Sequence, residues 1–279
     1  YNLENNSLIY KTDMGFIKDI FFTDILNYNI EFEGEFQYEW RQGVKHDASK
    51  IMELSINSEN KFVNGFNEVI DIEDTLVYPL LKSSDIKKYN LDYIFKKYVI
   101  ITQNKVGQST KYIEKECPKL WNYLNTKRDI FNKRKSKIYK NSPPFSIFGI
   151  GDYSFSKYKV VISGFYKEPI FKMVKNQKEV MLDDTCYFLS FNKEKEAMIA
   201  TIILNSELTK KFLLSIVNIE SKRPYTKKML SRINLGAVLK KLGYSYIKEF
   251  EMEIFDTDII TEDDYLSFRN TPTKEDRLF

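Results

Sequence analysis

Several chemistries are excluded by what this 279-residue sequence lacks. It has one histidine, His46, so an HExxH zinc site cannot form and a Ser-His-Asp triad would have to use that residue. The two cysteines, Cys117 and Cys186, stand far apart without a CxxC partner. That usage argues against a zinc ribbon or a disulfide scaffold and fits a reducing cytoplasm, where we expect the protein.

Nucleotide-binding and membrane signals are missing as well. The sequence contains neither GxxxxGK[ST] nor a glycine-rich turn followed by a ribose-binding acid. No apolar run approaches the roughly 18 residues that cross a bilayer, and the sequence shows no basic-then-apolar pattern of a signal peptide. We therefore expect no membrane partner. The chain opens at Tyr1 rather than Met, and we interpret it as part of a longer protein.

The charge is unevenly distributed along the chain. Residues 82–140 hold sixteen Lys and Arg against five Asp and Glu, whereas residues 248–279 hold four against ten. A basic body with an acidic end suggests a polyanionic partner for the body. The alternative is a solvated, lysine-rich surface with no partner.

The local patterns indicate an α+β fold, with mixed, irregular β-structure flanked by helices. Residues 98–102, 159–163 and 187–191 are short apolar runs typical of strands. The strongest helix prediction runs from Cys117 to Lys137, with Pro118 in the first turn and a basic face. Further helices are predicted at 193–205, 207–217 and 234–242, the last ending at Gly243.

Two basic loops are candidates for phosphate contact. In WRQGVKHD, Gly43 permits a tight turn that would direct Arg41 and Lys45 the same way, with His46 beside them. The alternative is a surface loop whose His-Asp pair caps the next segment. In LKSSDIKKY the candidates are Lys82, Ser84 and Lys87, or else Ser84 simply caps a short turn.

The most informative stretch is FSIFGIGDYSFSKYK, residues 145–159. Its two glycines allow close backbone approach, and its aromatic rings and lysines suit a nucleic-acid surface. The alternative is a kinked β-hairpin with the rings in the core. The candidate DNA-binding residues here are Phe148, Tyr153, Ser154, Lys157, Tyr158 and Lys159.

A last basic segment, SKRPYTKK, opens a predicted helix, whose N-terminal N–H groups can bind phosphate. Its candidates are Lys222, Arg223, Tyr225 and Lys227, against the alternative of a solvated connector. The Asn-Ser-Pro-Pro-Phe string at 141–145 only superficially echoes an Asn-Pro-Pro-Tyr methylation loop, because Ser replaces its first Pro. We predict no catalytic residue and no metal ligand in this chain.

The order of these strings resembles one family. WRQGVKHDASKIMEL, VYPLLKSSDIK, the Pro-x-x-Trp-x-Tyr-Leu helix, FSIFGIGDYSFSKYKVVISGFYK, DDTCYFLSF and KRPYTKKMLSRINL succeed one another between about Phe32 and Leu242. This order is similar to the C-terminal target-recognition region of bacterial adenine-N6 DNA methyltransferases, including those of restriction-modification systems. The resemblance implies a TaqI-like specificity domain that reads double-stranded DNA.

The same resemblance implies that DNA recognition and methyl transfer belong to different domains of the parent protein. A methyltransferase domain of the parent chain, absent here, would bind S-adenosylmethionine and transfer the methyl group, whereas this part would hold no cofactor. We expect residues 1–30 to be an extension toward that domain, 31–245 the recognition domain and 246–279 an acidic tail. Two other interpretations stay open: a metal-dependent nuclease using Asp47, Glu53 and the Asp183-Asp184 pair, and an interaction subunit that never touches DNA.

Overall fold

The structure is a computed structural model that describes residues 15–17, 20–22, 24, 28–34 and 38–271. The chain divides into two compact units. One unit, residues 41–163 and 172–193, contains most of the strands, and we call it the β-rich unit. The other unit, formed by 1–40, 164–171 and 194–279, contains the long helices, and we call it the helical unit. The division at 30 and 245 expected from the sequence differs from these boundaries and stays a prediction.

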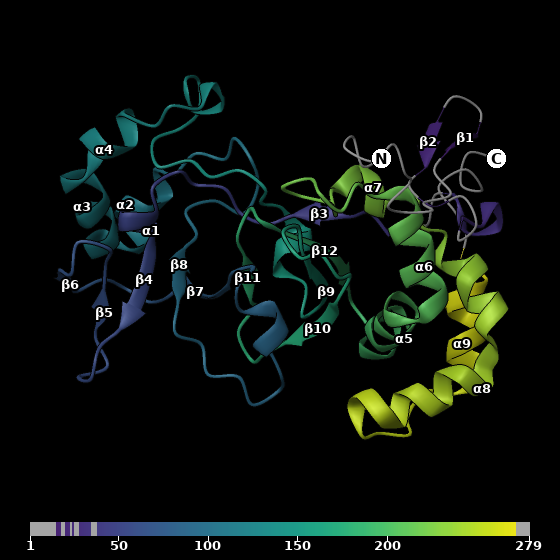
Figure 1. Cartoon of the computed structure of the whole chain (residues 1–279). Coiled ribbons are helices and arrows are strands. Elements are labelled where there is room, and N and C mark those ends of the chain that lie inside the picture. The colour runs from purple at the N-terminus through teal and green to yellow at the C-terminus, as the bar shows by residue number, and fades with distance from the viewer. Residues whose placement is uncertain (1–14, 18–19, 23, 25–27, 35–37, 272–279) are drawn as a thin grey trace. The chain divides into compact units, whose positions relative to one another are not determined.

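Two sheets form the β-rich unit (Figure 1). The larger has the order β11-β7-β8-β4-β5-β6, in which the β11–β7 pair is parallel and the other four pairs are antiparallel. The smaller has the order β10-β9-β12-β3. The strands are β3 (Arg41–Gln42), β4 (Glu53–Ile56), β5 (Phe62–Val63), β6 (Val69–Ile70), β7 (Val77–Leu81), β8 (Tyr98–Ile100), β9 (Tyr158–Ser163), β10 (Phe171–Lys175), β11 (Met181–Leu182) and β12 (Cys186–Phe191).

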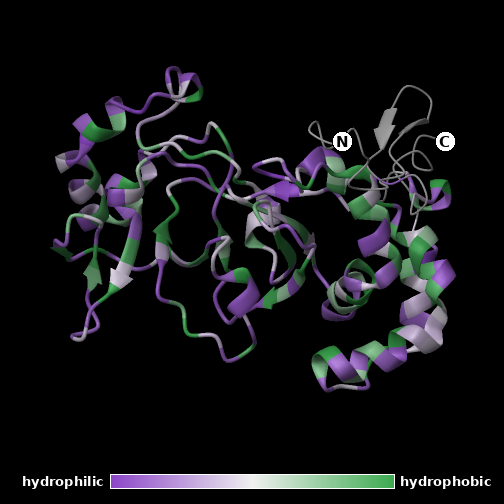
Figure 2. Cartoon of the chain, viewed as in Figure 1, coloured by the Kyte–Doolittle hydropathy of each residue, from purple (hydrophilic) through white to green (hydrophobic). Residues whose placement is uncertain are grey.

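Strands β9 and β12 are apolar on both faces and occupy the middle of the smaller sheet, which explains their near-continuous burial. Figure 2 draws the central strands of this sheet largely in hydrophobic colours and β3 in a hydrophilic one. Around the larger sheet, helices α1 (Ser49–Met52), α2 (Tyr112–Glu116), α3 (Pro118–Thr126) and α4 (Arg128–Asn132) contribute to one buried cluster that includes Leu54, Leu120 and Phe145. Three 3-10 turns complete this part: η2 (Ile86–Lys88), η3 (Lys137–Tyr139) and η4 (Asp152–Phe155).

The predicted helix from Cys117 to Lys137 is shorter and broken. Pro118 stands in the first turn of α3 as expected, but α3 ends at Thr126 and α4 ends at Asn132. The Asn125 and Thr126 side chains bond backbone carbonyls of the preceding turn. Such local bonds compete with a continuous helix, so the basic residues after 132 lie on a turn-rich segment instead.

The helical unit is built around α5 (Glu194–Asn205), which contacts α6 (Glu207–Ile216), α8 (Leu235–Phe255) and α9 (Glu262–Arg269). The predicted helices at 193–205 and 207–217 are thereby confirmed within a residue or so. Gly243 interrupts α8 with a φ of +80°, so it ends one helix, as predicted, but a second follows at once. The unit also contains β1 (Gly15–Ile17), β2 (Ile20–Phe22), η1 (Ile30–Phe32) and α7 (Lys227–Leu230).

The acidic C-terminal stretch is folded as far as the structure describes it. Helix α9 begins with a capping box at Thr261 and buries Tyr265 and Phe268. The fully buried carboxylate of Glu251 accepts the backbone N–H groups of Ile259 and Ile260 at 2.6 and 2.9 Å. Together the described parts have mixed sheets and flanking helices, which confirms the α+β class.

Candidate nucleic-acid interface

Three separate sequence strings meet in the β-rich unit at two glycines. Lys45 and Phe148 exchange backbone hydrogen bonds of 2.8 and 2.9 Å, and the Val44 N–H donates to the Leu182 carbonyl at 2.7 Å. A Cβ at Gly43 would lie 2.1 Å from the Asp183 carbonyl oxygen. We call this meeting point of residues 41–47, 148–155 and 182–186 the glycine junction.

Glycine is required at the junction for reasons that the sequence only partly indicated. Gly149 has a φ of +68°, and a Cβ there would lie 2.4 Å from the Gly43 carbonyl oxygen. Gly43, by contrast, lacks a positive φ and lies between β3 and the bridge residues Val44 and Lys45 without a turn, so the tight turn predicted for it is wrong. Its hydrogen atom in place of a side chain permits the backbones to touch.

Arg41 extends from β3 onto an aromatic ring. Its guanidinium carbon lies 4.4 Å from the centroid of Tyr153, whose ring in turn lies 6.1 Å from that of Phe188. A guanidinium stacked on a ring has less rotational freedom to lose and retains in-plane donors for a base edge or a phosphate. The pair joins two of the predicted candidates from strings more than a hundred residues apart.

Two of the predicted cations already have carboxylate partners. The Lys45 ammonium lies 2.5 Å from Asp47 and 3.9 Å from Asp184. Lys82 lies 2.8 Å from Glu53. Burial lowers the pKa of Lys82, but the hydrogen bonds to Glu53 and the negative charges of Glu53, Asp183 and Asp85 together outweigh burial and raise it. Either ammonium would have to share or exchange its partner to bind a phosphate.

His46 is buried rather than presented on the loop surface. Its Nδ1 accepts the Ala48 N–H at 3.2 Å, which leaves the proton on Nε2, 3.6 Å from Glu53. Burial lowers the pKa of His46, so the ring is neutral at pH 7. The side chain supports the loop, and only its neighbours are positioned to reach a ligand.

The aromatic stretch contributes both exposed and buried candidates. Phe148 is partly exposed and its ring lies 5.4 Å from that of Tyr139. Lys157 is exposed, with its ammonium 5.5 Å from the centroid of the partly exposed Tyr158. Ser154 is buried within 3.5 Å of the Gly149 carbonyl. The stretch forms η4 rather than the hairpin considered as an alternative.

Lys159 points into the β-rich unit. It is 2% exposed, its ammonium donates to the Ser156 carbonyl at 2.6 Å, and burial lowers its pKa to about 7. A side chain so enclosed cannot reach a phosphate without unfolding the strand that carries it. We therefore leave Lys159 out of the candidate surface.

The turn after β7 presents Ser84 and Lys87, and both are exposed. Ser84 does not cap η2, because the N-cap residue is Asp85, which accepts the Lys82 N–H at 3.2 Å. The capping alternative for Ser84 is therefore wrong, and its hydroxyl, 3.4 Å from Asp85, lies on the surface.

The four remaining candidates belong to the helical unit. Lys222 is exposed, and the Arg223 guanidinium lies 4.9 Å from the centroid of Phe165. Lys227 forms an ion pair with Glu39 at 2.6 Å. Tyr225 is fully buried and donates to the Lys167 carbonyl at 2.9 Å, so it anchors the segment and offers no surface to a ligand.

Sequence reasoning missed Arg134, whose hydrogen bonds hold the backbone next to the glycine junction. Arg134 donates to the carbonyls of His46 and Ser146 at 3.1 and 2.7 Å and stacks 3.6 Å from the centroid of Tyr139. Arg134 looks like one of several interchangeable cations in RKSK. Only its contacts distinguish it.

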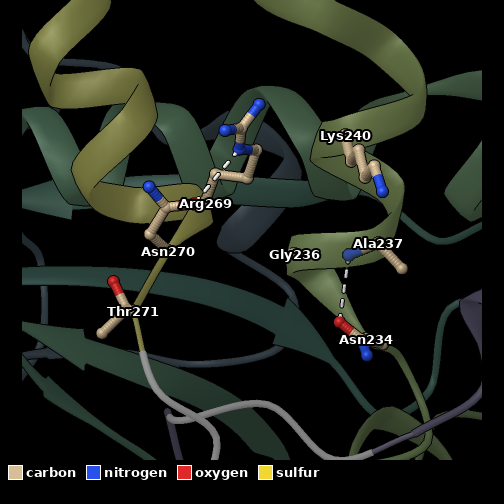
Figure 3. A pocket seen from close by; sticks show the side chains of 7 residues that line it. All are labelled: Asn234, Gly236, Ala237, Lys240, Arg269, Asn270 and Thr271. Atoms are coloured by element: carbon tan, nitrogen blue, oxygen red, sulfur yellow. Dashed lines mark hydrogen bonds between the residues drawn. The ribbon is translucent and has the colours of Figure 1, made fainter.

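The helical unit contains a hollow of about 370 Å³ at the start of α8 (Figure 3). The Asn234 side chain caps the helix by accepting the Ala237 N–H at 3.0 Å, and Lys240 and Arg269 bring positive charge. None of the residues singled out in the sequence lines it. Thr271, at its edge, is the last residue described before the C-terminus.

Acidic residues considered for a metal site are engaged individually. Glu53 pairs with Lys82, and Asp183 accepts from the Thr185 N–H at 3.1 Å. In the described ranges no group of three or more His, Cys, Asp or Glu is placed to hold a metal ion. Over the same ranges no helix has both the length and the apolar character needed to span a membrane.

Comparison with known proteins finds a homologous segment. The chain is 39% identical over 203 residues to the Type II methyltransferase M.NspV of a Nostoc species. The match includes 72% of this chain and 42% of that protein, so the chain spans less than half of the relative's length. Homology with part of a type II methyltransferase is thereby shown. The sequence matches no known protein-family profile.

Among solved structures, the type IIL restriction-modification enzyme MmeI in complex with DNA overlaps 90% of this chain and 33% of its own length. The TM-score is 0.45 and the sequence identity is 8%. A likeness this distant transfers neither fold nor function to the present chain.

Proposed function

We propose that this chain is the sequence-specific, double-stranded DNA-binding part of an adenine-N6 DNA methyltransferase of a restriction-modification system. The observation that carries the proposal is the 39% identity over 203 residues to part of a type II methyltransferase. That segment includes less than half of the relative, and neither methylation signature occurs in our sequence. Methyl transfer, with S-adenosylmethionine, is assigned to a domain outside this chain, and this chain is proposed to set which adenine is presented to it.

Neither of the two basic hollows among the described residues fits S-adenosylmethionine. A nucleoside cofactor needs an acidic side chain for its ribose hydroxyls and a glycine-rich turn for close approach. The two hollows lined by basic residues, at the start of α8 and beside α4, offer no carboxylate. The cofactor therefore belongs to the partner domain in this proposal.

The DNA-contacting surface is proposed to centre on the glycine junction. Arg41, held on Tyr153, would read a base edge in the major groove, where an Arg can bond guanine through two donors. The exposed Lys157 would contact a backbone phosphate beside it. Lys87, Lys222 and Arg223 remain proposed phosphate contacts, whereas His46, Lys159 and Tyr225 are proposed to support the fold only.

A TaqI-like specificity-domain architecture is part of the same proposal. Its support is the order of the strings within the chain and the convergence of three of them in space at Gly43 and Gly149. Residues that read bases lie on loops held by a rigid scaffold in such an arrangement. The paired sheets around the junction supply that scaffold here.

The test is direct binding to a random-sequence duplex pool, followed by selection and sequencing of the bound DNA. We expect enrichment of one short motif and an affinity that falls steeply as KCl rises, because phosphate contacts release counterions. A chain that binds no duplex at low salt, or binds without salt dependence, would overturn the proposal. Adding Mg²⁺ with plasmid DNA, and separately a labelled methyl donor, tests the nuclease and complete-methyltransferase alternatives.

A matched pair of variants tests the surface itself. Lys157→Gln should lower the slope of log affinity against log salt by about 0.9, the value for one phosphate contact. Lys61→Gln removes the same charge from a lysine already 2.8 Å from Glu59 and serves as the control. Equal slopes for the two variants and the unmodified chain would remove Lys157 from the surface.

A further inference from the structure

The segment after α4 presents positive charge that the rest of the β-rich unit does not neutralise. Lys133, Lys135, Lys137 and Lys140 are all exposed. Within the described residues none of their ammonium groups forms an ion pair or a hydrogen bond. This differs from Lys45 and Lys82, which face carboxylates, and it makes the segment the more available cationic surface.

Beside this segment lies a pocket of about 280 Å³. Three cationic side chains border it, Arg128, Arg134 and Lys140, and no carboxylate does. The volume exceeds that of a phosphate group, so an anion can enter together with part of the chain that carries it. The rest of the lining comes from Phe131, Asn132, Ser136, Tyr139 and the 142–145 turn.

The pocket wall is braced by Arg134, which makes several structural contacts. Its guanidinium donates to the carbonyls of Phe131, His46 and Ser146 and lies on the ring of Tyr139. The Tyr139 hydroxyl in turn donates to the Lys45 carbonyl at 3.3 Å. The wall is therefore connected to the glycine junction by hydrogen bonds. A ligand in the pocket would be held at a fixed position relative to the glycine junction.

The two other cations have donors to spare. The Arg128 Nε and Nη2 donate to the Asn125 side-chain oxygen, which leaves donors of the guanidinium for another acceptor, since it carries five N–H groups. Its guanidinium carbon lies 5.4 Å from the centroid of Phe145, which limits its movement. Lys140 is held only through its backbone, by its N–H bond to Lys137.

We propose that this pocket is a docking site for a backbone phosphate of the bound duplex, with Arg128 and Lys140 as its ligands. The inference rests on the proposed function and adds a site outside the predicted set. A phosphodiester on this wall fixes the position of the strand without reading sequence. The glycine junction would read the bases, and this pocket would set the register of the duplex against it.

The test compares Arg128→Gln/Lys140→Gln with the unmodified chain by fluorescence anisotropy on a labelled duplex over a KCl series. Loss of two phosphate contacts should reduce the salt slope by about 1.8 and weaken binding by about 60-fold at 0.1 M salt. The loss should be equal on the selected motif and on a scrambled duplex, because phosphates carry no sequence. Circular dichroism and thermal melting establish that the variant is folded.

The control is Lys61→Gln/Lys119→Gln, which removes two charges already paired with Glu59 and Asp71. We expect its salt slope to match that of the unmodified chain. If the pocket variant instead matches this control while the unmodified chain binds duplex, the pocket inference is wrong and the proposed function stands. If the unmodified chain binds no duplex, the proposed function itself fails.

A third arm separates a phosphodiester of DNA from a free anion. Inorganic phosphate is titrated against the unmodified chain and the pocket variant by thermal shift. We expect millimolar phosphate to shift the melting temperature of the two proteins equally. A single phosphate ion makes none of the other contacts that a DNA strand makes with the protein. A millimolar stabilisation lost in the variant, together with an unchanged duplex slope, would assign the pocket to a small anion and overturn the proposal.

Discussion

Gly149 adopts a φ of +68° directly against Gly43, whose carbonyl oxygen would lie 2.4 Å from any Cβ placed at Gly149. The contact joins two strings separated by about a hundred residues, and the Asp183 backbone closes it from the third side. Arg41, Lys45 and Phe148 emerge from this one framework. A surface that reads DNA needs such a fixed framework, because base edges are discriminated at hydrogen-bond distance.

The first prediction concerns the close approach at the glycine junction. Gly43→Ala should cost about 2 kcal/mol or more, because its methyl would overlap the Asp183 carbonyl and the backbones would have to separate. Gly107→Ala, at a φ of +82° with nothing within 4 Å, should cost about 1 kcal/mol from backbone strain alone. Urea unfolding measures both, and a Gly43 variant no less stable than the Gly107 variant would contradict the prediction.

The second prediction concerns the buried ammonium of Lys159. Its folded pKa of about 7 lies below the unfolded value of 10.5, so between these values the unfolded chain binds one more proton. Stability should therefore rise with pH above about 7, by at most about 1.4 kcal/mol per pH unit from this group. Urea unfolding between pH 7 and 8.5 measures the slope.

Lys159→Met serves as the comparison, because its side chain has similar length and no charge. Subtracting its pH profile from that of the unmodified chain isolates the lysine from other titrating groups, including the cysteines whose pKa is raised by burial. We also expect Lys159→Met to leave the DNA salt slope unchanged. A reduced slope in the folded variant would return Lys159 to the binding surface.

The third prediction concerns Asp47, which neutralises Lys45. Asp47→Asn should strengthen duplex binding and increase the salt slope by about 0.9, because the Lys45 ammonium keeps only its longer contact of 3.9 Å with Asp184 and can turn to a phosphate. Asparagine tolerates the positive φ of +50° found at Asp47, so the loop should keep its conformation. Glu59→Gln, which releases Lys61 elsewhere on the unit, should leave binding unaltered. Equal behaviour of the two variants would exclude Lys45 from phosphate contact.

The fourth prediction distinguishes base recognition by Arg41 from the effect of its positive charge. Arg41→Lys retains the positive charge but loses the planar fork that stacks on Tyr153. The salt slope should stay constant while the preference for the selected motif over scrambled DNA falls by about 1 to 3 kcal/mol. Competition binding with both duplexes measures this ratio. Equal losses on both duplexes would instead make Arg41 a backbone contact.

Local signals in the sequence sufficed for several elements. The helices at 194–205 and 207–216 follow from periodic apolar residues, and the central strands from continuous apolar runs. The helix beginning at Pro118 was predicted with the correct start and the wrong length. Side-chain bonds from Asn125 and Thr126 to the backbone interrupt it, and propensity alone does not reveal them.

The sequence predicted which segments contribute to the candidate site. It did not predict which of their side chains are exposed and free of a carboxylate partner. Lys157 and Lys159 are equivalent by type and separated by one residue, but Lys157 precedes β9 and is exposed, whereas Lys159 lies within β9 and is buried. Likewise, Lys45 and Lys82 look like free cations until Asp47 and Glu53 are seen beside them. Partners distant in sequence determine which charges a ligand can reach.

By itself the sequence determined the α+β class, the uneven distribution of charge and the ordered strings that resemble a DNA-reading domain, because these depend on residue type and local order. The tertiary structure alone decided which glycine needs to be a glycine, which lysines are neutralised or buried, and that Arg128 and Lys140 border one pocket. Those properties depend on atoms brought within a few ångströms by chain folding, and no local pattern encodes that distance.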